Sequence, residues 1–318
     1  MHTFPELVAA FDTRFAALAL PNRPPQTLYE PLRQFLAIGG KRVRPVLCLM
    51  AAELLGPIQE DAWNAALAIE LFHNFTLVHD DIMDEAPLRR GHPTVHARYG
   101  LTSGILGGDA LCILAYDYLS QIRKPLQPIL EVFNHTALEV CEGQQLDMDF
   151  EKQTDVSVAD YIEMIRLKTS VLLGGALKIG ALLGGASIHV ADKLYQFGQS
   201  LGIAFQLQDD YLDAFGESDK TGKQPGGDIL ADKKTFLHLH TLSQNVPGYP
   251  DALRQTNPET KIAAVRSCFE ISGAQTRCRE EVTRYSNEAM QALEDLTIVS
   301  ARKKPLEALS AFLLDRNY

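Results

Sequence analysis

The chain has 318 residues, and 46% of them are hydrophobic, which is enough to bury a large core. Thirty basic residues against forty acidic ones give a net charge of −10. This balance argues against the broad basic surface that nucleic acid or an anionic membrane would require. We therefore expect no nucleic-acid partner, and any anionic substrate must be met by local basic groups or by bound metal.

The cysteines and the apolar stretches bear on the compartment. The five cysteines include no C-x-x-C pair, so neither a zinc site nor a disulfide framework is indicated. The longest apolar stretch, Val171 to Ala186, is shorter than a membrane span and is interrupted by Lys178. Charged residues near the N-terminus break any signal-peptide core. We expect a cytoplasmic protein without membrane insertion.

Apolar residues recur at helical spacing through almost every segment, as at Leu67, Leu71 and Val78. Alternating strand patterns are not evident. Glycine and proline fall where helices would end, and residues 245–258 resemble a surface loop. The sequence predicts an all-α protein: one domain over residues 1–318, built as a bundle of roughly ten or more helices around a central cavity.

The first acidic cluster, His79-Asp80-Asp81-Ile82-Met83-Asp84, ends a long apolar helix pattern. Asp80 and Asp84 stand at i and i+4, so both carboxylates project from one face. Basic residues lie on both sides of it along the chain. They are Lys41, Arg42 and Arg44 after a glycine pair, and Arg89 and Arg90 after Pro87.

The second acidic cluster, Gln206 to Asp213, repeats this arrangement, with Asp209 and Asp213 at i and i+4. A single D-D-x-x-D motif is a solvated acidic helix end about as often as it is a metal site. Two such motifs, each after a buried type of helix, favour a hard divalent cation such as Mg²⁺, held by carboxylates and substrate phosphates. Lysines follow this cluster too, at Lys220, Lys223, Lys233 and Lys234.

Each basic group also has an ordinary interpretation. A basic cluster is more often a solvated surface patch, a lone histidine such as His73 is usually a core residue, and Lys168-Thr169 could be a pair on a helix surface. The position of basic clusters beside both acidic clusters favours phosphate recognition, by bidentate arginine and by lysine as a point charge.

Taken in order, the motifs resemble those of the trans-isoprenyl diphosphate synthases. They are G-G-K-R-V-R-P, H-N-F-T-L-V-H-D-D-I-M-D, L-R-R-G-H-P-T, G-Q-Q-L-D-M-D, K-T, F-Q-L-Q-D-D-Y-L-D, and G-K-x-x-G-G-D with K-K-T. The match runs from about Gly39 to Thr235. The resemblance implies the all-α isoprenoid synthase fold, a homodimer and three Mg²⁺ ions.

The resemblance also implies roles for individual positions. Isopentenyl diphosphate would be bound by Lys41, Arg44, His73 and Arg90. The allylic diphosphate would be bound by Arg89, Lys168, Thr169, Gln206, Lys223 and Lys233. Asp80, Asp84 and Asp209 match catalytic metal ligands, and Asp81, Asp210 and Asp213 match supporting metal carboxylates. Lys168, Thr169 and Gln206 match further catalytic positions, which do not bind the metal.

The implied reaction joins isopentenyl diphosphate head-to-tail to dimethylallyl or geranyl diphosphate and releases pyrophosphate. Metal and cations draw charge onto the leaving diphosphate, and the carbocation must be kept from water. Residues 216–227 are the expected closing loop. Alternatives are a class I terpene cyclase or a head-to-head synthase, which the separate isopentenyl site disfavours, and a non-catalytic partner subunit, which the intact aspartates disfavour.

Product length is predicted from Phe75 and Thr76, on the helix below the first aspartate cluster. Helix geometry puts Thr76 one turn below Asp80 and Phe75 about 140° around from it. In the family that this chain resembles, an aromatic residue at the position of Phe75 tends to stop growth at farnesyl diphosphate, which we expect as the product. The short D-D-x-x-D leaves geranylgeranyl diphosphate as the alternative.

Overall fold

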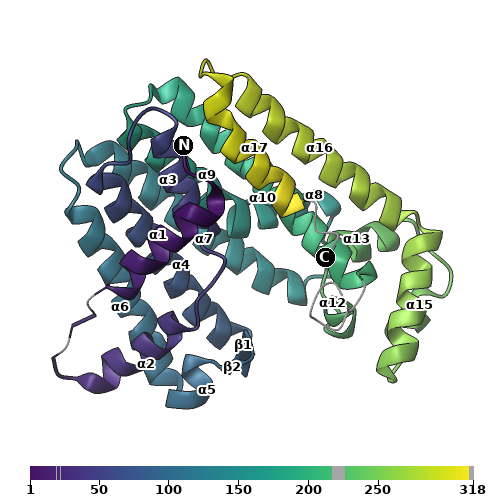
Figure 1. The fold of residues 1–318 in the computed structure, drawn as a ribbon. Coiled ribbons are helices and arrows are strands. Elements are labelled where there is room, and N and C mark those ends of the chain that lie inside the picture. The colour runs from purple at the N-terminus through teal and green to yellow at the C-terminus, as the bar shows by residue number, and fades with distance from the viewer. Residues whose placement is uncertain (19, 22, 217–225, 315–318) are drawn as a thin grey trace. The chain divides into compact units, whose positions relative to one another are not determined.

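The protein is described by a computed structural model, which covers residues 1–318 except 19, 22, 217–225 and 315–318. The described residues are almost wholly helical (Figure 1), which confirms the all-α prediction. Within these residues, the strands are β1 (Leu88–Arg89) and β2 (His92–Pro93), paired in an antiparallel hairpin.

The helices gather into two compact units, which are described separately. The first unit comprises residues 1–134, 175–192 and 298–305, and the second holds the rest of the described chain. Four helices give residues to both units: α7 (Gln127–Lys152), α9 (Val171–Gly184), α10 (Ile188–Phe215) and α17 (Ser300–Leu314). The single domain expected over residues 1–318 stays a prediction.

In the first unit, the long helix α4 packs against α3 and α6. The helices of this unit, besides those shared with the second, are α1 (Phe4–Ala16), α2 (Gln26–Ala37), α3 (Val43–Glu53), α4 (Glu60–Met83), α5 (Val95–Tyr99) and α6 (Leu101–Ser120). Glycines allow close packing, because a Cβ at Gly108 of α6 would overlap the His79 ring and one at Gly180 would overlap the Cys48 carbonyl. The buried middle of α4 therefore fixes the first aspartate cluster at its C-terminal end.

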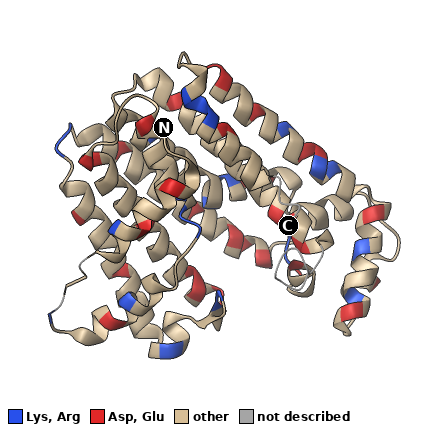
Figure 2. Cartoon of the chain, viewed as in Figure 1, with Lys and Arg blue, Asp and Glu red and all other residues tan. Residues whose placement is uncertain are grey.

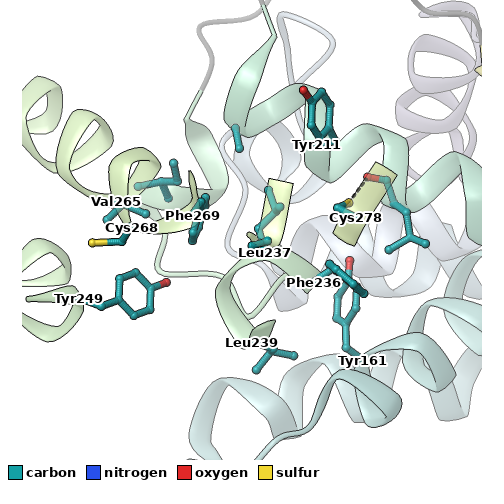
Figure 3. Packing of buried hydrophobic residues seen from close by; sticks show 14 of the residues in the cluster. Tyr161, Tyr211, Phe236, Leu237, Leu239, Tyr249, Val265, Cys268, Phe269 and Cys278 are labelled. Carbon is teal, nitrogen blue, oxygen red and sulfur yellow. Dashed lines mark hydrogen bonds between the residues drawn. The ribbon is translucent and has the colours of Figure 1, made fainter. Parts of the chain in front are cut away.

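The second unit is built around the second aspartate cluster on α10. Its other helical elements are α8 (Val158–Ile165), the π-helical turn η1 (Arg166–Ser170), α12 (Gly227–Leu230), α13 (Phe236–Ser243), α14 (Tyr249–Leu253), α15 (Pro258–Ile271) and α16 (Ala274–Glu294). Tyr161, Tyr211 and Phe236 belong to its core (Figure 3), where the Cys278 thiol donates to the Leu207 carbonyl at 3.5 Å.

The prediction of a surface loop at residues 245–258 is wrong in the middle of this segment, where α14 forms. Gly248 adopts a left-handed φ of +81° as the N-cap of α14, and a proline occupies the first turn of that short helix. Tyr249 is only 1% exposed, and its hydroxyl lies 2.9 Å from Nδ1 of His238. The glycine and prolines of this segment start helices here rather than mark a solvated loop.

Two further features of the helices concern their surface charge and their burial. Acidic and basic residues are interspersed along α15 and α16 (Figure 2). The continuous helical run Val158–Gly184 is long and apolar enough to cross a membrane, with a mean hydropathy of 1.3. Because 72% of its most apolar window is buried inside the protein, it has the burial of a core helix.

Candidate active site

The three aspartates of the first cluster differ in how far their side chains are exposed. α4 ends at Met83, and the Asp84 backbone N–H donates to the Asp80 carbonyl at 2.8 Å. Asp80 is half-buried and Asp84 is exposed, whereas Asp81 is only 1% exposed. Oδ1 of Asp81 accepts from both Nε and Nη2 of Arg89 at 2.8 Å, and its Oδ2 has no partner among the described residues. Asp81 therefore positions Arg89, and its expected metal role stays a prediction.

A two-residue turn presents the neighbouring arginines. Arg89 pairs with His92 across the β1–β2 hairpin, and Arg90 and Gly91 follow with φ values of +52° and +76°. Two successive positive φ values are typical of the type I′ turn that fits the strand twist. Arg90 donates to the Gly39 carbonyl, and a Cβ at Gly40 would lie 2.9 Å from its Nη1. The glycine pair thus makes room for Arg90.

Arg44 and His73 lie together in the first unit. Nη1 of Arg44, in the first turn of α3, is 3.3 Å from Nε2 of His73. Burial lowers the pKa of Arg44 to about 10, which leaves it charged, although Glu70 and Asp80 oppose that shift. Burial, reinforced by Arg44 and Arg90, lowers the pKa of His73 well below its usual value. The imidazole is therefore neutral in a cationic environment suited to an anion.

Lys41 is exposed, two residues before α3 begins. The expected isopentenyl diphosphate residues therefore all come from the first unit. The structure brings both Arg44 and Arg90 into electrostatic range of His73.

The residues expected to limit product length belong to an aromatic cluster on α4. The Phe75 ring centre lies 5.4 Å from that of Phe72 and 4.9 Å from that of His79. Phe72 in turn meets Phe133 at 5.3 Å, and both are 2% exposed. Thr76 donates its hydroxyl to the His73 carbonyl at 2.8 Å. Phe75 is thus the least buried of these three phenylalanines.

A series of hydrogen bonds crosses the second aspartate cluster. Oγ1 of Thr169 donates to Oε1 of Gln206 at 3.5 Å, and Nε2 of Gln206 donates to Oδ1 of Asp210 at 3.1 Å. The Tyr161 hydroxyl donates to Oδ2 of Asp210. Burial raises the pKa of Asp210 to about 8, an effect that the hydrogen bonds from Tyr161 and Gln206 oppose and the charge of Asp228 adds to. A nearby cation would favour its charged form.

Asp213 fixes the segment that follows. Its Oδ2 accepts from the Asp228 backbone N–H at 2.9 Å, and its carbonyl accepts from the Gly226 N–H at 2.6 Å. Nζ of Lys233 lies 3.9 Å from Oδ1 of Asp228. These bonds hold α12 against the end of α10. Asp209 lies on the same helix, Lys223 lies outside the described residues, and so does most of the expected closing loop at 216–227.

Lys168 and Thr169 lie in η1, an uncommon π-helical turn of the kind often found at functional sites. Glycines of two other helices let the chain pack tightly here. A Cβ at Gly143 of α7 would overlap the Lys168 backbone, and one at Gly202 of α10 would lie 2.7 Å from the Ser170 Cα. Nζ of Lys168 also pairs with Asp147 of α7. The turn is therefore clamped between α7 and α10.

Three residues with clear contacts were missing from the sequence-based assignment. Asp147 stands in the G-Q-Q-L-D-M-D motif and Asp228 ends the G-G-D motif, so both carried a signal in the sequence. Tyr161 did not, because an aromatic residue in an apolar helix normally indicates a core position. Its hydroxyl finds Asp210 only in the folded chain.

The donor set fits a hard divalent cation. Carboxylates supply oxygen ligands, which Mg²⁺ prefers, and it is usually held by one or two of them together with substrate phosphates and water. No group of three or more His, Cys, Asp or Glu side chains in the described part of the chain is arranged to hold an ion alone. Within its own unit, each aspartate pair, Asp80 with Asp84 and Asp209 with Asp213, offers carboxylate oxygens to an ion whose other ligands would be substrate phosphate and water.

Comparisons with known proteins agree with these motifs. A family model described as polyprenyl synthetase matches residues 25–272. A geranylgeranyl diphosphate synthase of Methanosarcina mazei is 38% identical over 302 residues, covering 94% of this chain and 93% of its own. A geranylfarnesyl diphosphate synthase of Natronomonas pharaonis is 36% identical over 319 residues, with the same coverage.

Among solved structures, a crystal structure of a geranylgeranyl pyrophosphate synthase is 42% identical, with a TM-score of 0.93 and complete coverage of both chains. The helical fold and the two aspartate-rich helix ends define an all-α prenyltransferase. The chain belongs to the polyprenyl synthetase family.

Proposed function

We propose that this protein condenses isopentenyl diphosphate head-to-tail with an allylic diphosphate to make geranylgeranyl diphosphate. The observation that carries this proposal is the pair of aspartate-rich helix ends, each with its own basic side chains: Arg44, Arg89 and Arg90 with the first, Lys168 and Lys233 with the second. Two such sets suit two diphosphates. A terpene cyclase binds only one, and a non-catalytic subunit would need neither.

The product assignment departs from the farnesyl diphosphate expected from Phe75. The relatives are named geranylgeranyl or geranylfarnesyl diphosphate synthases, and they give farnesyl diphosphate no support. They favour the alternative that the short D-D-x-x-D left open. Because Phe75 contacts Phe72 and His79 on its own helix, its presence alone is a weak guide to where chain growth stops.

Each residue then has a defined task. Arg44, His73 and Arg90, with Lys41, would hold isopentenyl diphosphate, whose double bond attacks the allylic carbon. Arg89, Lys168 and Lys233, with Lys223, would hold the allylic diphosphate, and Thr169 and Gln206 would turn their dipoles toward the developing cation. Bound Mg²⁺ would supply charge for the departure of pyrophosphate. The released pyrophosphate would take the proton that the new cation loses, which restores a double bond, so atoms and charge balance.

We also propose a cytoplasmic homodimer. The five cysteines all lie among the described residues and form no disulfide with one another, in keeping with a reducing compartment. α6 exposes the large apolar side chains Leu101, Ile105, Leu106 and Ile113, at 57%, 43%, 54% and 69%, with the exposed Asp109 among them. Apolar side chains gathered on one helix indicate an interaction surface, and a second copy of the chain is the occupant that the resemblance favours.

Product analysis tests the proposed function. The purified protein would be incubated with isopentenyl diphosphate, Mg²⁺ and dimethylallyl, geranyl or farnesyl diphosphate, and the dephosphorylated alcohols separated by chromatography. Geranylgeraniol from all three primers supports the proposal. Farnesol as the end product would restore the original expectation, cyclic hydrocarbons would indicate a cyclase, and no product would indicate a non-catalytic subunit.

A further inference from the structure

Arg42 lies between Lys41 and Arg44 in the chain, but its side chain is buried. Its backbone φ of +52° lies in the left-handed region that residues other than glycine rarely adopt. The side chain is only 5% exposed. Its Nε donates to Asp12 at 2.8 Å, its Nη1 donates to Glu70 at 2.5 Å, and its guanidinium lies 4.4 Å from the Phe15 ring centre. These contacts occupy both the charge and one face of the guanidinium.

Glu70 makes this arrangement rigid. Its side chain is 5% exposed, and Oε1 also accepts from Nδ2 of Asn74 at 3.3 Å. Nδ2 of Asn74 bonds in addition to the Glu70 carbonyl at 2.7 Å. Glu70 precedes His73 by three residues on α4, so the carboxylate that holds Arg42 and the imidazole beside Arg44 are neighbours on one helix. Removing one member of a buried ion pair leaves the other charge buried without a partner, which strongly destabilises the fold.

α1 provides the second set of contacts that hold the Arg42 side chain. Asp12 and Phe15 are spaced i and i+3, so they share a face of α1, and both contact Arg42. The helix begins with a capping box in which Thr3 and Glu6 satisfy each other's backbone N–H groups. A separate ion pair joins Arg14 of α1 to Glu60 of α4 at 2.6 Å. No step of the condensation uses α1.

We infer that Arg42 is a positioning residue and not a diphosphate ligand: Asp12 of α1 and Glu70 of α4 hold it so that the adjacent Lys41 and Arg44 meet isopentenyl diphosphate. The N-terminal helix thereby sets the affinity for this one substrate. The inference rests on the proposed function, because it assigns a support to the isopentenyl site of that reaction. A left-handed backbone in the middle of the segment needs such an anchor to persist.

Asp12→Asn gives the sharpest test, because it keeps the size of the side chain and removes its charge. We expect the KM for isopentenyl diphosphate to rise about tenfold, as for a site whose ligands are displaced by a fraction of an ångström. The KM for the allylic substrate and kcat should change less than about twofold. If Arg42 instead bound phosphate directly, freeing it from Asp12 would lower the KM for isopentenyl diphosphate. The two readings therefore predict opposite signs.

Two further variants complete the experiment. Glu60→Gln removes the other α1 ion pair, which is exposed, and should leave the KM for isopentenyl diphosphate unchanged. Arg42→Lys keeps the charge but loses the planar fork, and should reproduce Asp12→Asn, with melting temperatures checked for all three. Equal effects of Glu60→Gln and Asp12→Asn would overturn the role of Arg42, as would an unchanged KM in Asp12→Asn. A wild-type protein that makes no product would overturn the proposed function and this inference together.

Discussion

At the scale of single residues, burial decides which charges face a substrate. Arg44 and Arg42 are two positions apart, yet one lies 3.3 Å from the neutral His73 and the other is neutralised by two carboxylates. Arg44 keeps its charge although partial burial lowers its pKa, and its Nε is buried without a partner among the described residues. A diphosphate bound here, as proposed, would gain charged hydrogen bonds without first displacing a protein partner from that nitrogen.

Substitution of these basic residues should separate the two substrates. Arg44→Ala should raise the KM for isopentenyl diphosphate by the loss of a charged hydrogen bond, about 1.5–3 kcal/mol. Lys233→Ala should act on the allylic diphosphate instead, since its Nζ lies near Asp228 in the second unit. Steady-state kinetics with each substrate varied in turn measures both effects. Similar weakening of both substrates by both changes would contradict separate sites.

The Phe75 side chain tests the limit on product length. Phe75→Ala should shift the products toward longer chains, since each buried CH₂ gains about 0.8 kcal/mol and only steric closure stops growth. Phe75 is less buried than Phe72, so the change should be tolerated by the fold. Chromatography of the dephosphorylated alcohols gives the answer. An unchanged distribution would place the end of the tunnel at other residues, with the buried Phe72 and Phe133 as the next to examine.

At the scale of elements, the π-helical turn η1 depends on glycines in other helices. Gly143→Ala should strongly reduce turnover, because the added Cβ would overlap the Lys168 backbone and displace both Lys168 and Thr169. Backbone cannot move aside as a flexible side chain does. Turnover and melting temperature should both fall. Gly56→Ala is the matched control, because a Cβ there meets nothing within 4 Å, and normal activity in Gly143→Ala would refute the clamp.

The elements also show what a sequence can predict. The apolar periodicity predicted α4 and α10 and placed an aspartate cluster at the end of each, because both signals are local. It could not distinguish Asp81, which turns inward to Arg89, from Asp80 beside it, since that difference depends on the hairpin that follows. The π-helical turn was not predicted either, because the glycines that clamp it lie in distant helices.

At the scale of the whole molecule, the product prediction failed to find support for a related reason. A rule based on Phe75 is local, whereas the length of a bound chain depends on every wall of the cavity. The similarity to the relatives extends over 94% of the chain, so it reflects all of these walls together, and the names of these relatives favour a longer product. The motifs proposed to bind diphosphate, by contrast, are short and were assigned from sequence by resemblance.

The exposed face of α6 makes the proposed dimer testable. Ile113→Glu should yield a monomer, because it puts a charge in the middle of an apolar interface. Ile271→Glu on α15 is a matched control, since both isoleucines are 69% exposed, and it should leave the assembly unchanged. Light scattering coupled to size exclusion measures the mass of each. A wild-type monomer, or a dimer that survives Ile113→Glu, would contradict this assignment.

In the proposed condensation, pyrophosphate leaves the allylic substrate as isopentenyl diphosphate adds to it. This reaction is tested most directly by measuring pyrophosphate release from geranyl diphosphate with and without isopentenyl diphosphate. Rapid release is expected only with both substrates and Mg²⁺, at one pyrophosphate for each isopentenyl unit incorporated, and it should be lost on chelation by EDTA. Rapid release without isopentenyl diphosphate, or none with both substrates present, would contradict it.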